Sequence, residues 1–101
     1  MYFAVMKLGF DEEHREIRDL KTMKSISEKV RSRFKVNVLC SNSPSAAFEI
    51  VISALSLREE KLNNLLDTIE DFLENEGIGR ITSESTLMDH VDNIEEFEQD
   101  G

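Results

Sequence analysis

The amino-acid sequence predicts one α+β domain whose elements follow the order β-α-β-β-α-β. Two amphipathic runs repeat their apolar residues at spacings of three and four, as helices do, and shorter segments rich in β-branched residues lie around them. The chain has 101 residues, of which 40% are apolar and 33% are charged, and this composition suits a single folded core.

The first half of the chain predicts a strand, a helix and a second strand. Residues 2–10 are apolar at both alternating sets of positions, which favours a central strand. A polar connector follows, and Asp19 is a candidate N-cap for a helix. The helix is indicated by the apolar stripe Leu20, Met23, Ile26 and Val30, and the second strand by the alternating residues Phe34, Val36, Val38 and Cys40. We expect Cys40 to be a small buried apolar residue.

The second half predicts a strand, a helix and an edge strand. The turn-forming residues 41–45 precede a β-branched run at 46–55. Ser56 and Glu59 have the spacing of a capping box, and Gly77 can end the helix that follows. That helix carries the apolar stripe Leu62, Leu65, Leu66, Ile69, Phe72 and Leu73. A weakly alternating edge strand at 78–87 completes a domain at 1–88, and an acidic tail occupies 89–101.

Three features resemble the YlxP-like family of small bacterial proteins of unknown function: an apolar N-terminal strand, the run from Leu20 through Val38, and the closing helix. The match covers roughly residues 1–83. The resemblance implies a ferredoxin-like sandwich, with a four-stranded antiparallel sheet and two helices on one face. It also implies an accessory role in translation or ribosome maturation. The chain departs from the family at 43–47, where a charged and aromatic block is replaced by small residues.

The charge of the chain is unevenly distributed. Its net charge is −9, yet residues 15–35 contain eight basic and three acidic residues, a local charge of +5, which leaves −14 elsewhere. Basic side chains on a helix can bind RNA phosphates, although a solvated helix face has the same appearance. We predict that the partner contacts, with RNA or the ribosome, are made by Lys21, Lys24, Arg31 and Arg33.

No pattern in the sequence predicts catalysis. The chain has no glycine-rich phosphate loop, nucleophile elbow or paired cysteine motif. Acylphosphatases share the expected fold and use an arginine in the first loop, but here that loop is acidic, with Asp11, Glu12 and Glu13. Two segments, Asp11-Glu12-Glu13-His14 and Asp89-His90-x-Asp92, combine carboxylates with imidazole, which are groups that can bind divalent metals. A charged loop is the better explanation of both, since no second His or Cys group lies at ligand spacing. We therefore predict a non-enzymatic interaction domain with no cofactor and no metal site.

The sequence also gives expectations about partners and location. The apolar residues on both faces of 2–10 indicate that the open sheet face is covered, most simply in a homodimer. An alternative is a regulatory domain of the ACT type that binds a small molecule near Gly9 and the loop at 11–14. A third possibility is that the acidic tail screens the basic helix. We expect no signal peptide, no membrane segment and a cytoplasmic location, since a single cysteine cannot form an internal disulfide.

Overall fold

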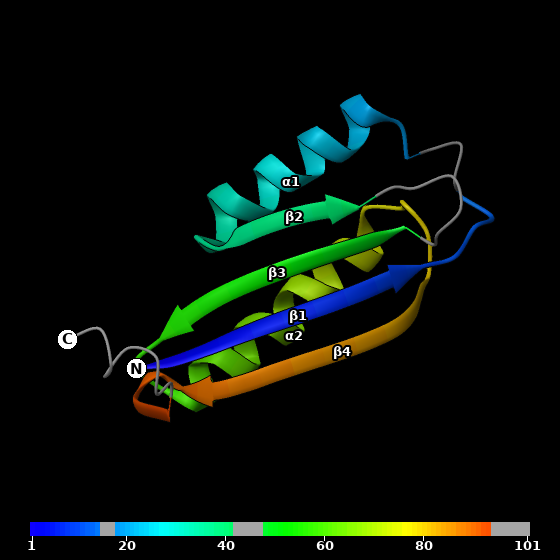
Figure 1. Cartoon of the computed structure of the whole chain (residues 1–101). Coiled ribbons are helices and arrows are strands. Elements are labelled where there is room, and N and C mark those ends of the chain that lie inside the picture. The colour runs from blue at the N-terminus through cyan, green and yellow to red at the C-terminus, as the bar shows by residue number, and fades with distance from the viewer. Residues whose placement is uncertain (15–17, 42–47, 94–101) are drawn as a thin grey trace.

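The computed structural model describes residues 1–14, 18–41 and 48–93. It contains a four-stranded sheet in the order β2-β3-β1-β4, and every neighbouring pair of strands is antiparallel. Two helices connect the strands in the order β-α-β-β-α-β, as the sequence predicted. Figure 1 shows α2 running behind β1 and β3, with α1 beside β2, so the viewer looks onto the face of the sheet that carries no helix.

The central strand β1 (Tyr2–Phe10) pairs with β3 (Glu49–Ser56) on one side and β4 (Ile81–His90) on the other. Among the described residues, the strand β2 (Asn37–Ser41) pairs with β3 alone and β4 pairs with β1 alone, so these two strands form the edges. The helices are α1 (Leu20–Phe34) and α2 (Glu59–Asn75), and a short 3₁₀ turn η1 (Val91–Asn93) follows β4.

The hydrophobic core lies between the sheet and the two helices. Every second residue of β1, namely Ala4, Met6, Leu8 and Phe10, is buried there. The helices bury most of the stripes that their spacing predicted, with Met23, Ile26 and Val30 from α1 and Leu62, Leu66, Ile69 and Leu73 from α2. The prediction was wrong for Leu20 at the start of α1, which is 87% exposed, and Leu65 and Phe72 are only partly buried. Because a strand turns alternate side chains to opposite faces, Phe3, Val5, Lys7 and Gly9 lie on the open face. Tyr2, at the start of the strand, is partly buried against the core.

The first helix ends later than the sequence predicted, and Phe34 is its last residue rather than part of the second strand. Lys35 has a left-handed backbone (φ 57°), and its N–H donates to the carbonyl of Arg31 at 2.9 Å. This conformation ends the helix and turns the chain into β2. The Phe34 ring packs edge-on against Phe72 of α2, with centroids 5.6 Å apart, so the side chain joins the two helices.

Two local expectations in the second half were wrong. The N-cap of α2 is Arg58, without a side-chain cap, and the Ser56 hydroxyl instead accepts from the Arg58 N–H at 3.2 Å. A capping box is therefore not formed. The strand β4 runs to His90, two residues beyond the predicted boundary at 88. The remaining tail from 94 onward, with the proposed screening of α1, lies outside the described residues.

The buried position expected for Cys40 was also wrong, because this thiol is exposed. Cys40 lies on the edge strand β2, in a groove of about 280 Å³ between that strand and α1. Its sulfur lies 3.0 Å from the Ser27 hydroxyl, and Leu20, Met23 and Leu39 line the same groove. The inward residue Val38 of the same strand is buried, so the exposure of Cys40 reflects its place near the end of this edge strand. No helix among the described residues is long and apolar enough to cross a membrane.

Candidate interaction surfaces

The basic residues of α1 lie on its solvent side. Asp19 caps the helix by accepting from the Thr22 N–H at 2.7 Å, and the buried stripe of α1 then faces the sheet. This orientation places all four predicted contact residues, Lys21, Lys24, Arg31 and Arg33, in exposed positions. The opposite charge predominates on α2, where six carboxylates accompany a single lysine. The two helices thus present surfaces of opposite sign.

The structure separates these four residues into two pairs. Arg31 donates from Nη2 to the Val38 carbonyl at 2.9 Å and so ties α1 to the edge strand β2. The guanidinium of Arg33 lies over the rings of Phe34 and Phe72, 5.5 and 5.3 Å from their centroids. Both arginines therefore stabilise the fold through their contacts. Lys21 and Lys24 project from the first two turns of α1, and no such tertiary contact is found for them within the described ranges.

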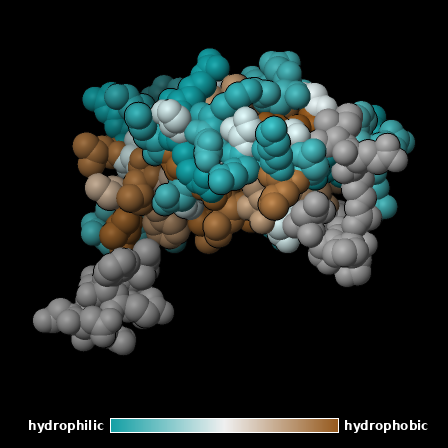
Figure 2. All heavy atoms as spheres, turned by 90° about the horizontal axis from the view of Figure 1, so that it is seen from above, coloured by the Kyte–Doolittle hydropathy of each residue, from teal (hydrophilic) through white to brown (hydrophobic). Residues whose placement is uncertain are grey.

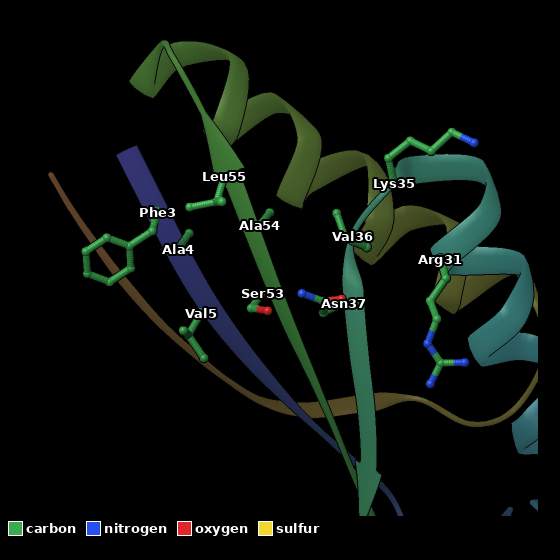
Figure 3. Close-up of a pocket in the computed structure, with 10 residues that line it drawn as sticks. All are labelled: Phe3, Ala4, Val5, Arg31, Lys35, Val36, Asn37, Ser53, Ala54 and Leu55. Carbon is green, nitrogen blue, oxygen red and sulfur yellow. The ribbon is translucent and has the colours of Figure 1, made fainter. Parts of the chain in front are cut away.

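A cleft of about 490 Å³ opens at the end of the sheet where β3 continues past β2. Figure 3 shows Phe3 and Val5 on β1, with Leu55 on β3, at one side of this cleft and Arg31 on α1 at the other. Asn37 and Ser53, which are register partners on β2 and β3, lie between them. The cleft combines apolar and basic walls, and it merges with the open face of the sheet.

The loop after β1 is held by a buried arginine that sequence reasoning did not single out. Arg18 is only 2% exposed, and its guanidinium donates to the carbonyls of Ile78, at 2.9 Å, and of Asp11. It also lies 3.6 Å from the Asp11 carboxylate and 5.1 Å from the centre of the Phe48 ring. Gly79 borders it so closely that an added Cβ would lie 2.7 Å from Arg18 Nη1. Arg18 therefore joins the β1–α1 and α2–β4 connections.

The carboxylate of Asp11 also holds the loop after β1 in place. It accepts from His14 Nδ1 at 3.0 Å and from the Arg80 N–H at 3.3 Å. The hydrogen bond with His14 is the main reason that the pKa of the Asp11 carboxyl lies below its ordinary value. Asp11, Glu13 and His14 each offer one atom that could bind a metal ion, and these three atoms lie within 4.8 Å of one another. The Asp11 carboxylate is engaged by His14, by the Arg80 N–H and by Arg18, so it holds the loop to the α2–β4 connection.

A pair of carboxyl groups links α2 to the edge strand β4. Glu70 is partly buried on the helix, and its carboxyl group is hydrogen-bonded to that of Glu84. Burial raises the pKa of Glu70 to about 7, and the hydrogen bond and the neighbouring charges of Glu84, Glu74 and Asp67 add to the effect. Two carboxylates this close cannot both be charged without repulsion. Sequence reasoning missed this pair because its members lie on different elements.

Comparisons with known proteins support the fold. No protein-family model and no curated protein matches the chain, so the resemblance to the YlxP-like family stays a prediction. Among solved structures, a protein from Deinococcus radiodurans that is assigned as an antibiotic biosynthesis monooxygenase is 14% identical, with a TM-score of 0.52. The alignment covers 90% of this chain and 92% of that one. The chain has a ferredoxin-like fold.

Two further structures resemble this ferredoxin-like chain more weakly. A designed protein with a ferredoxin fold is 13% identical, with a TM-score of 0.48 and 88% and 83% of the two chains covered. An acylphosphatase from Bacillus subtilis is 11% identical, with a TM-score of 0.47 and coverage of 89% and 87%. Similarities this weak say nothing about activity, because one fold supports many unrelated functions. The function must therefore be argued from the surfaces of this chain.

Proposed function

We propose that this chain is a non-enzymatic interaction domain that binds RNA, on the ribosome or elsewhere, through the exposed basic side of α1. The observation that carries the proposal is the position of Lys21 and Lys24, three residues apart at the start of the helix. Residues at this spacing lie on the same side of a helix, and the helix dipole makes its first turns electropositive. Lysine ammonium groups placed there can each neutralise one phosphate.

The contacts of the two arginines reduce the set of residues at which RNA binding can be tested. Arg31 and Arg33 are exposed, but Arg31 is bonded to the Val38 carbonyl and Arg33 is stacked on two rings. Replacing either arginine would disturb the fold together with any binding. Lys21 and Lys24 are therefore the residues at which RNA binding can be tested separately from stability.

Changing Lys21 and Lys24 together to Glu should weaken binding to mixed ribosomal RNA at least tenfold at about 0.1 M salt. The loss of two phosphate contacts should also reduce the slope of log affinity against log salt by about 1.5 to 2. Fluorescence anisotropy with labelled RNA over a salt series measures both quantities.

The matched control for this experiment is the double change of Arg58 and Lys61 to Glu. It alters the net charge by the same amount at the start of α2, where the surface is mostly acidic. The control should bind RNA like the unmodified chain. An equal loss in both variants, or no RNA binding by the unmodified chain, would contradict the role of α1.

The alternative is a regulatory domain that binds a small molecule beside the loop at 11–14. There a hollow of about 490 Å³ is lined by His14, Glu74, Gly77, Gly79 and Arg80, whereas Asp11 is engaged by His14 and Arg18. We further propose that the domain works as a homodimer. Formation of the dimer would leave α1 exposed on each copy, because α1 does not contribute to the open face of the sheet (Figure 1).

A further inference from the structure

The open face of the sheet combines exposed apolar residues with very few charges. Three of its leucines are largely exposed, namely Leu39 at 72%, Leu55 at 65% and Leu87 at 62%. Phe3, Val5 and Val51 are half-buried beside them. Figure 2 shows hydrophobic residues gathered along the lower side of the molecule, which is the side of this face, and hydrophilic residues over the helices. Exposed apolar surface arranged in this way is typical of an interaction site.

The strand register arranges these side chains in rows across the sheet. The first row contains Leu55, Phe3 and Asp89; the second contains Asn37, Ser53, Val5 and Leu87; the third contains Leu39, Val51, Lys7 and Ser85. The fourth row contains Ser41, Glu49, Gly9 and Ser83, none of which has a large apolar side chain. The apolar patch therefore occupies the first three rows, and Val5 on the central strand lies at its middle.

The charges within this patch are compatible with burial. Lys7 and Glu49 lie on neighbouring strands, with Nζ and carboxylate oxygen 3.6 Å apart, so their charges compensate each other. Asp89 lies on the edge strand, at the margin of the patch. An interface without an uncompensated central charge avoids the main cost of bringing two copies together.

We propose that the open sheet face binds the same face of a second copy of this chain, with a twofold axis passing close to Val5. Two sheets pack face to face about 10 Å apart, and their apolar side chains interdigitate. At this position of the axis, the apolar rows of one copy meet those of the other, and the polar fourth row stays at the rim. The inference names the surface used by the homodimer proposed above and rests on that proposal.

The size of the patch sets the expected strength of the dimer. Three rows across four strands cover about 400 Å² of sheet, which corresponds to roughly 800–1,000 Å² of surface buried in total. An interface of this size lies below the roughly 1,200–2,000 Å² of stable complexes and belongs to the class of weak, transient ones. We therefore expect a dimer with a dissociation constant in the micromolar range.

Changing Leu55 and Leu87 together to Glu should raise the dimer dissociation constant at least 30-fold, because four carboxylates would then face apolar side chains. The change of Leu57 to Glu is the matched control, since Leu57 is 77% exposed but follows β3 and lies outside the face. Sedimentation velocity on the full chain at 1–100 µM measures both, and circular dichroism checks that each variant is folded. A monomeric unmodified chain, or a dimer that persists in the Leu55/Leu87 variant, would overturn the inference.

Crosslinking tests the position of the axis. In a chain with Cys40 changed to Ser, Val5→Cys should be joined to its copy by a short maleimide crosslinker, while Ser41→Cys in the polar fourth row should not. Equal crosslinking of the two variants would overturn the proposed axis.

The variant with Lys21 and Lys24 changed to Glu should keep the dimer dissociation constant of the unmodified chain. Failure of the RNA proposal would therefore leave the dimer result unchanged, and the reverse also holds.

Discussion

Replacing Arg18 by Met should lower the free energy of unfolding by about 3 kcal/mol. The change removes the donors to the carbonyls of Ile78 and Asp11 and the cation beside the Asp11 carboxylate. These acceptors would remain buried or partly buried without their partner, and leaving such groups unpaired costs more than the net value of the original bonds. Methionine fills a similar volume, so the effect of a cavity is small.

Urea denaturation at pH 7 measures this effect, and Arg80→Met provides the control. Arg80 lies in the same connection, but its side chain is exposed, and Asp11 contacts only its backbone N–H. The control should lose less than about 0.5 kcal/mol. A loss below about 1 kcal/mol for Arg18→Met would show that solvent replaces the contacts of the guanidinium.

Changing Glu70 to Gln should stabilise the protein at pH 8 by about 1–2 kcal/mol and leave its stability at pH 4 nearly unchanged. The pKa of Glu70 is raised to about 7 in the folded state, above its ordinary value of 4.5. The folded state therefore holds a proton that the unfolded state releases between about pH 4.5 and pH 7. Stability falls as pH rises through this window, and the full cost is present above it. The magnitude includes a reduction for the partial exposure of the group.

Thermal and urea unfolding at pH 4, 6 and 8 test this prediction by the difference between each variant and the unmodified chain. Glu84→Gln should give a similar gain at pH 8, because it removes the other member of the pair. Asp71→Asn is the control, as Asp71 is an exposed carboxylate on the same helix. A gain of the same size for Asp71→Asn would indicate a general effect of charge on α2 in place of the specific pair.

The sequence predicted the order of elements because each element carries a strong period. The helical stripes and the doubly apolar strand β1 are local patterns, and the packing of the core preserves them. The errors occur where tertiary structure decides a local choice. Phe34 satisfies the alternation of a strand, but a left-handed Lys35 one residue later places it in the helix. Cys40 satisfies an inward alternation, but it lies near the end of the edge strand β2, where it is exposed.

The surfaces could be predicted only in part for a similar reason. Charge along the sequence was sufficient to find the basic residues of α1, but not to show that Arg31 and Arg33 are engaged by β2 and by Phe72. Nor does the sequence indicate that Arg18 is buried, since its acceptor on Ile78 lies 60 residues away. The pair of Glu70 and Glu84 likewise depends on where α2 crosses the sheet. Contacts between residues on different elements leave no pattern in the sequence of either element.

The two ends of the described chain lie close together, so the distance between them can be used to follow the opening of one sheet edge. The Val91 N–H donates to the Met1 carbonyl at 2.9 Å, and β1 is the one strand that pairs with β4 in the part of the chain that the structure describes. A strand held on one side has fewer bonds to break than the strands at the centre, so we expect β4 to detach before the rest of the domain unfolds. Fluorescent labels at residues 1 and 93 would start in close proximity. Their separation under mild denaturant would then report the opening of this edge before global unfolding.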